Sequence, residues 1–266
     1  MFTTNPFSIL AETVPPIVLQ SFVIVMVALV IIGTLVDIIH KKNVKYFFEN
    51  AKKAKLSATK TLSAGEKISV ISKTIVSDIA TTSELGAGKR RVAHLLGMYG
   101  TILFWTGSVI MIFCYSSPSS DTPSFWPIIW HVGAIMTVVG GSWFWFFLRV
   151  DVYSEAHPWY RIIKADLFVL ALIASSLFGL IWSCLQSLNL NDRWDDKVFL
   201  VLYIISNFVL FGGVYWSKFA HMFYKPGASI QKNLAEADGS RDNLPPPADA
   251  PEQYGLGIDR EKAKHY

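Results

Sequence analysis

Two of the six histidines lie in segments that could together hold a metal-containing prosthetic group. His94 is part of RVAHLLGMYG, and His221 is part of SKFAHMFYKP. Two neutral imidazoles on facing helices can supply both axial ligands of a b-type haem, which is then held without covalent attachment. The alternative is a pair of histidines that only hydrogen-bond to nearby loops. His40 and His265 lie in charged segments and are interpreted as surface residues.

The composition predicts an integral membrane protein as the setting for these histidines. Of the 266 residues, 52% are of the AVILMFWYC types and 17% are charged, against about 25% charged residues in typical soluble domains. This excludes a disordered chain, a coiled coil and an ordinary soluble enzyme. The net charge of +4 comes mostly from loops, so it is interpreted as topology information and predicts no nucleic-acid partner.

Five stretches are long and apolar enough to cross a bilayer, because a spanning helix needs about 20 apolar residues. We therefore expect an all-α integral membrane protein with five transmembrane helices. A short outer N-terminus over 1–16 precedes spans at 17–36, 92–115, 125–148, 167–188 and about 198–219, and the last four form a core bundle over 92–225. The connection 37–91 carries twelve Lys and Arg residues and the connection 116–124 carries none. This asymmetry places the N-terminus outside and the C-terminus inside.

The cytoplasmic segments have patterns of their own. In the basic loop 37–91, isoleucines recur at steps of three and four between glycine breakers, which predicts an amphipathic helix: Ile68, Ile71, Ile75 and Ile79. That helix could lie on the inner membrane surface or serve as a docking platform for a soluble partner. The Pro-rich tail 226–266 is predicted to be extended, with 231–252 as a linker. Its Tyr254, Leu256 and Ile258 could form a docking peptide, with plain disorder as the alternative.

The span directions place the two histidines at similar depth. His94 lies at the inner start of the second span and His221 at the inner end of the fifth. Gly97 and Gly100 would let a porphyrin or a neighbouring helix approach closely. Basic side chains near this level are candidate partners for haem propionates: Arg90, Arg91 and Lys218.

The two histidine segments resemble a family of membrane cytochromes b. This family includes the nitrate reductase gamma subunit, the heterodisulfide reductase membrane subunit and the membrane domain of the quinone-interacting oxidoreductase complex. The resemblance covers about 89–226, and SKFAHMFYKP is its most specific part. It implies that His94 and His221 bind haem b, and that electrons pass between a soluble redox subunit and quinone at the bacterial inner (cytoplasmic) membrane.

The N-terminal NPF, the basic loop and the Pro-rich tail most resemble the membrane anchor encoded with adenylylsulfate reductase in sulfur oxidisers. This narrower resemblance implies that adenylylsulfate reductase is the partner, docked through loop 37–91 and tail 226–266. Family members with two haems carry a second histidine farther out on the same two spans. The corresponding stretches 101–112 and 199–213 contain no histidine. We therefore expect one haem b at most, with quinone as an exchangeable substrate.

Two further groups of residues could contact a quinone or take up protons. His131, with Trp126 and Trp130, lies near the outer end of the third span, although aromatic belts are common at membrane interfaces. The inner loop that follows this span clusters titratable and aromatic side chains: Glu155, His157, Tyr160 and Arg161. A solvated loop with local ion pairs is the alternative. Lys164 and Asp166 are expected to pair with each other or with lipid head groups.

The sequence thus predicts a non-catalytic electron-transfer and anchor subunit of an oxidoreductase complex. It contains no flavin motif, cluster motif or nucleophile constellation, and Cys114 and Cys184 are expected to be buried thiols. A purely structural membrane anchor without haem is the competing prediction. A transporter is a further alternative, although the sequence lacks repeated halves and midplane charges.

Overall fold

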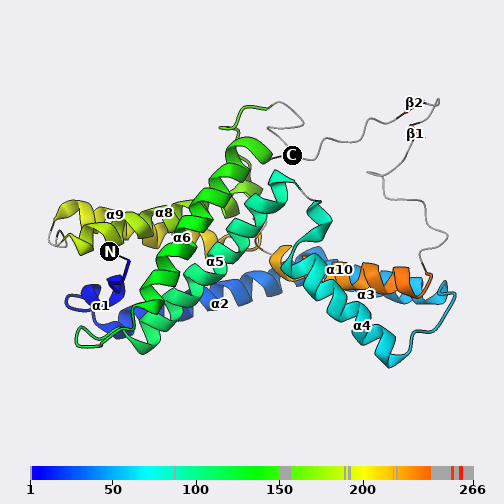
Figure 1. Ribbon diagram of the computed structural model, residues 1–266, viewed down its shortest axis with the longest axis horizontal. Helices are drawn as coiled ribbons and strands as arrows, with labels where there is room; N and C mark the ends of the chain where they lie inside the picture. Colours follow the sequence, from blue (N-terminus) through cyan, green and yellow to red (C-terminus); the bar gives the residue numbers. More distant parts are fainter. Residues whose placement is uncertain are drawn as a thin grey trace. The chain divides into compact units, whose positions relative to one another are not determined.

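The computed structural model describes residues 2–86, 88–149, 157–188, 190, 193–217, 219, 221–240, 253–254 and 258–259. The regular elements of this part are helices, together with two antiparallel two-residue strands, β1 (Gln253–Tyr254) and β2 (Ile258–Asp259). The chain divides into two compact units. We call Met1–His40 with Val92–Ala220 the bundle unit, and Lys41–Arg91 with His221–Tyr266 the loop–tail unit (Figure 1).

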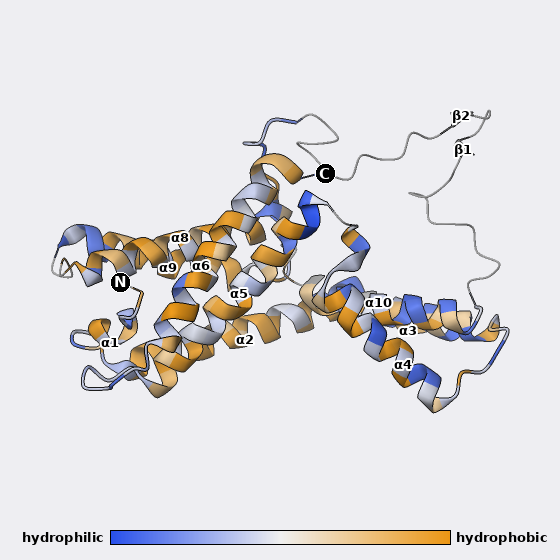
Figure 2. Cartoon of the chain, in the orientation of Figure 1, coloured by the Kyte–Doolittle hydropathy of each residue, from blue (hydrophilic) through white to orange (hydrophobic). Residues whose placement is uncertain are grey.

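Among the described residues, four helices of the bundle unit are long and apolar enough to cross a membrane. They are α2 (Pro16–Lys41), α5 (Lys89–Cys114), α6 (Phe125–Trp143) with the π-helical turn η3 (Phe144–Leu148), and the short η4 (Lys164–Asp166) with α8 (Leu167–Ser187). Figure 2 shows hydrophobic residues along most of their length. These helices coincide with the first four predicted spans and indicate a multi-pass membrane protein.

The fifth predicted span differs from the helix that the structure contains. α9 (Trp194–Gly212) begins four residues earlier than expected and ends seven residues before position 219. The chain turns at Gly213, where a Cβ atom would lie 2.6 Å from the Val209 carbonyl oxygen. A side chain at position 213 would therefore collide with the last turn of the helix, and α9 ends at two consecutive glycines although the apolar composition continues. At 19 residues, α9 is about 28 Å long, and its first turn carries Asp195 and Asp196.

α5 and α6 approach each other until their backbones touch. A Cβ atom on Gly133 of α6 would lie 2.5 Å from the Phe104 nitrogen, and one on Gly100 of α5 would lie 2.7 Å from the Thr137 nitrogen. Glycines permit such contacts, which stabilise helix pairs in lipid through van der Waals packing. Of the two predicted uses for Gly100, the structure therefore selects a neighbouring helix over a porphyrin.

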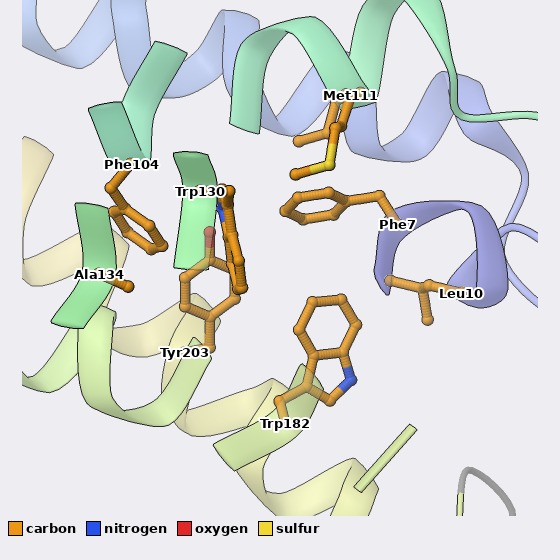
Figure 3. Packing of buried hydrophobic residues seen from close by; sticks show 9 residues of the cluster. Phe7, Leu10, Phe104, Met111, Trp130, Ala134, Trp182 and Tyr203 are labelled. Atoms are coloured by element: carbon orange, nitrogen blue, oxygen red, sulfur yellow. The ribbon is translucent and has the colours of Figure 1, made fainter. Parts of the chain in front are cut away.

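An aromatic cluster forms the core of the bundle unit (Figure 3). The short helix α1 (Pro6–Leu10) inserts Phe7 into this cluster, with ring centroids 5.9 Å from Trp130 and 5.6 Å from Trp182. Trp182 in turn stacks on Tyr203 of α9 at 5.9 Å. The segment is held by Asn5, whose side chain accepts a hydrogen bond from the Phe7 nitrogen and donates one to the Tyr115 carbonyl. The N-terminal segment is thus part of the folded bundle.

The loop–tail unit contains α3 (Asn43–Leu56), α4 (Ala64–Thr74), the π-helical η1 (Ile75–Ala80), the turn η2 (Ser83–Leu85) and α10 (His221–Ala237). α4 and η1 confirm the predicted helix through the isoleucines. Its start is fixed by a capping box, in which Ser63 accepts a hydrogen bond from the Glu66 nitrogen and Glu66 accepts one from the Ser63 nitrogen.

The prediction of an extended tail is wrong for the first residues of the tail. α10 continues to Ala237 with Pro226 inside it, so positions 231–237 of the predicted linker are helical. Contacts with α4, described below, support this helix against the local preference of a polar segment with a proline. Tyr254 lies in β1 and Ile258 in β2, whereas Leu256 and most of the remaining tail lie outside the described residues.

Candidate functional site

His94 lies in the second turn of α5 and is exposed. Its neighbour Ala93 is buried against α6, because a Cβ on Gly140 of α6 would lie 2.7 Å from the Ala93 carbonyl oxygen. Successive helical residues point about 100° apart, so His94 projects beside the α5–α6 contact. One turn later, a Cβ on Gly97 would meet nothing within 4 Å. The α5 surface therefore has open space for a side chain at position 97, one turn from the imidazole.

His221 is the first residue of α10 and lies nine residues after the end of α9. The prediction that it lies on the fifth span is therefore wrong, because the glycine turn separates the two helices. His94 belongs to the bundle unit and His221 to the loop–tail unit. The His221 side chain and Lys218 lie outside the described residues. The pairing of the two imidazoles stays a prediction.

The basic pair before His94 forms the first turn of α5. Arg91 donates a hydrogen bond from Nε to the Thr81 carbonyl oxygen at 2.7 Å, and Arg90 is half-buried. Arg91 thus binds the backbone directly after η1. Its terminal nitrogens remain the part of the side chain that a propionate would bind, and the propionate role of both arginines stays a prediction.

Arg149, one of the charged residues of the inner loop after α6, holds the described part of this loop. Its Nη1 atom lies 2.8 Å from Asp166 Oδ2, and the two side chains are 5% and 8% exposed. Its Nη2 atom donates to the carbonyl oxygens of Trp159 and Arg161, and its guanidinium lies 3.9 Å from the centre of the Trp145 ring. Asp166 therefore pairs with Arg149, which corrects the expected pairing with Lys164. The sequence contains a signal for this ion pair, because opposite charges stand at the two ends of one inner loop.

The predicted inner quinone or proton site is placed only in part. Tyr160 and Arg161 are exposed, His157 is half-buried, and Glu155 lies outside the described residues. The Arg161 carbonyl is held by Arg149 while its side chain points to solvent. In the described part of this loop, Arg149 therefore holds the backbone at Trp159 and Arg161, and the side chains of Tyr160 and Arg161 lie on the surface.

His131 is fully buried in the bundle. Its Nδ1 atom lies 2.7 Å from the Pro127 carbonyl oxygen and its Nε2 atom lies 2.8 Å from Ser183 Oγ. Because a carbonyl only accepts, Nδ1 carries a proton and donates to the Pro127 carbonyl oxygen. The hydrogen bond between Nε2 and the Ser183 hydroxyl joins α6 to α8. His131 lies about 26 Å along the helix from Leu148, where the inner loop begins. His131 and the inner loop therefore cannot belong to one site.

Polar side chains also pair between helices in the bundle core. The Trp130 ring nitrogen donates to Ser108 Oγ at 2.8 Å, and Ser175 Oγ donates to Asn207 Oδ1 at 3.2 Å. Asn207 Nδ2 in turn donates to the Tyr203 carbonyl oxygen at 2.8 Å. These bonds satisfy groups that are costly to bury in lipid. They link α6 to α5 and α8 to α9.

Asp37, at the C-terminal end of α2, is a residue that the sequence analysis missed. It is almost completely buried and, with Met26, makes up the buried residues of that helix. A carboxylate so placed in a spanning helix marks a position of structural or functional importance.

The expectation of two buried thiols is wrong for Cys114, which is exposed. Cys184 is half-buried.

Within the described part of the chain, no group of three or more His, Cys, Asp or Glu side chains could hold a metal ion. Comparison of the chain with protein-family models, with curated proteins and with solved structures gave no match to any of the three.

Proposed function

We propose that this chain is the membrane-embedded anchor and electron-transfer subunit of an oxidoreductase complex. It holds a cytoplasmic enzyme at the bacterial inner membrane and links it to the quinone pool. Adenylylsulfate reductase is the partner that the sequence resemblance favours. The observation that carries the proposal is the folding of the basic loop and the tail into one unit.

Two segments that are separated in sequence by the whole bundle come together in this unit. Asn233 Nδ2 donates to Asp78 Oδ2 at 2.7 Å and to Thr74 Oγ1 at 2.8 Å. Lys225 Nζ lies 2.7 Å from Glu84 Oε2. A folded surface outside the apolar bundle is what a membrane anchor needs in order to hold a soluble partner, and this unit supplies one from both predicted docking segments.

The bundle supports the anchoring half of the proposal. α8 and α9 lie side by side (Figure 1), and α9 is close in length to the roughly 30 Å hydrocarbon core of a bilayer. With α9 as a fifth crossing, the N-terminus lies outside and both segments of the loop–tail unit lie inside. The core of packed aromatic rings and neutral hydrogen bonds fits a rigid scaffold better than a solute path.

The electron-transfer part of the proposal requires one haem b, which His94 and His221 would hold. The exposed imidazole of His94 beside the open space at Gly97 supports this assignment. When bound, the haem supplies a one-electron carrier. His221 would provide its ligand from the start of α10, and Arg90, Arg91 and Lys218 are placed by sequence to hold the propionates. The quinone would exchange beside the inner loop that carries His157 and Tyr160.

A visible difference spectrum tests the haem directly. The purified full chain is compared, reduced minus oxidised, with a His94→Ala, His221→Ala variant and with His265→Ala as the control for histidine removal. We expect a b-type α-band in the wild type and in the control, and its loss in the double variant. A flat spectrum from a monodisperse wild type would leave the purely structural anchor.

Truncation tests the docking surface independently of the haem. Deleting residues 226–266 removes most of α10 and is expected to release the partner enzyme from membranes. Truncation after Ser240 keeps α10 whole, so retained partner would assign docking to the folded unit and released partner to the terminal peptide. Unchanged co-sedimentation after the longer deletion would contradict docking through the tail.

A further inference from the structure

The helix formed by α4 and η1 turns its polar side toward the inside of the loop–tail unit. Thr74 is fully buried, and both Thr74 and Asp78 receive hydrogen bonds from Asn233 of α10. Ser229 of α10 donates a further hydrogen bond to Asp78 at 3.3 Å. The seam between the two helices is therefore polar, although the helix carries a row of isoleucines.

The apolar side of the same helix faces outward. Ile68, Ile75 and Val76 are 65%, 46% and 64% exposed, and Ile71 and Ile79 are half-buried. Figure 2 shows hydrophobic and hydrophilic residues interleaved along α4. A helix on a soluble domain buries its apolar stripe, and a contiguous apolar patch left outside marks an interaction surface. We call the row Ile68, Ile71, Ile75 and Ile79 the isoleucine stripe.

The charge around the isoleucine stripe is strongly positive. The segment 41–91 holds twelve Lys and Arg residues and four Asp and Glu residues, which gives a net charge of +8. Three of the four acids are engaged inside the unit: Glu66 caps α4, Asp78 binds Asn233, and Glu84 pairs with Lys225. The outward-facing charge is therefore mainly basic, and two lysines of α4 are exposed: Lys67 and Lys73.

We propose that α4 and η1 form an interfacial helix that binds an anionic lipid surface. The isoleucine stripe inserts at the level of the head groups, and Lys67 and Lys73 bind lipid phosphates, which is the arrangement of monotopic amphipathic helices. The segment 41–91 is joined to candidate membrane spans at both ends, because it begins where α2 ends and leads into α5. Lipid is therefore an available binding partner. The charge and the apolar stripe together favour lipid over a soluble protein as the occupant.

Lipid-dependent quenching of a single probe tests the insertion. Ile75→Cys is introduced into the full chain with Cys114→Ser and Cys184→Ser, labelled with an environment-sensitive dye and reconstituted into vesicles. The vesicles contain phosphatidylcholine alone or with phosphatidylglycerol, each with nitroxide-labelled lipid. Asn50→Cys, exposed on α3, is the matched control position. We expect a blue-shifted, quenched dye at position 75 in the anionic vesicles and a solvent-like dye at position 50.

Two results would overturn the proposal. One is a dye at position 75 that stays in water in both vesicles and is shielded only when a soluble oxidoreductase is added, which would make the stripe a protein-docking surface. The other is equal quenching in neutral and anionic vesicles, which would remove the role of anionic lipid.

Lysine removal tests the charge term on its own. Lys67→Gln with Lys73→Gln is compared with Lys52→Gln and Lys55→Gln on α3, which removes the same charge from exposed positions of the same unit. Each basic residue near an anionic surface is worth up to about fivefold in partitioning. We expect the quenching at position 75 to fall by up to about this factor per lysine for the α4 pair, and to change little for the α3 pair. Equal losses for both pairs would contradict specific binding by α4.

Discussion

The guanidinium of Arg149 lies 2.8 Å from the carboxylate of Asp166, and both side chains are buried. Arg149 follows the last turn of α6 and Asp166 immediately precedes α8. The pair therefore closes the loop between two candidate membrane-spanning segments, and the carbonyls of Trp159 and Arg161 bind the same guanidinium. One arginine thus holds the chain on both sides of Tyr160, one of the predicted quinone residues.

Removing either partner of this pair should destabilise the bundle. Arg149→Ala leaves the Asp166 carboxylate buried without its counter-charge, and such losses cost about 3–5 kcal/mol. The thermal midpoint of the purified chain in detergent measures the effect, with Arg161→Ala as the control because that side chain is exposed. Equal midpoints for both variants would show that the ion pair does not hold the loop.

The backbone contact between α5 and α6 predicts opposite effects for two glycine substitutions. Gly133→Ala places a methyl group 2.5 Å from the Phe104 nitrogen and is expected to cost about 1–3 kcal/mol, because the two backbones must separate. Gly97→Ala lies on the same helix pair but meets no atom within 4 Å. It should be neutral or stabilise by up to about 1 kcal/mol through helix propensity. Thermal unfolding of the two variants side by side measures the difference in stability.

The N-terminal segment is expected to stabilise the bundle through Phe7. Phe7→Ala removes a buried ring from between Trp130 and Trp182, and truncations of this size in a packed core cost about 3–5 kcal/mol. Phe2→Ala is the matched control, since Phe2 is 46% exposed. A lowered thermal midpoint and a red-shifted tryptophan emission are expected for Phe7→Ala. An unchanged emission would mean that the ring does not fill the cluster.

Acid should open the loop–tail unit. Hydrogen bonding from Ser83, with further bonds from Asn233, Ser77 and Ser229, lowers the pKa of Asp78 from 3.8 to about 2. Because the pKa is depressed in the folded state, this contribution to stability is present above about pH 4 and is lost as the pH falls toward 2. The pairing with Lys225 lowers the pKa of Glu84 as well, so it acts in the same direction.

Protection of α10 from pepsin between pH 2 and pH 5 measures this acid opening. Cleavage in the wild type should increase as the pH falls below about 4. Asp78→Asn removes the titrating group and should flatten the part of the profile that Asp78 contributes. A wild-type profile that is retained in the variant would assign the acid sensitivity to other groups.

The sequence by itself determined where four apolar helices lie, because hydropathy is summed over about 20 neighbouring residues and needs no knowledge of partners. The helix through Ile68 and Ile79 was predictable for the same reason, since a period of 3.6 is a local property. The direction in which the apolar side of this helix faces was not predictable from the sequence. That depended on Asn233, more than 150 residues away, which binds Asp78 and turns the polar side inward.

Tertiary structure alone decided the features that depend on distant pairs. Polar composition and Pro226 favoured an extended tail, but contacts with α4 accompany a helix to Ala237. Local sequence placed Lys164 beside Asp166, whereas the buried partner is Arg149 from the other end of the loop. The sequence around Gly100 did not distinguish between close approach by a porphyrin and close approach by a helix. A pairing across the fold depends on which surfaces meet in space, and a single sequence records only the order of residues along the chain.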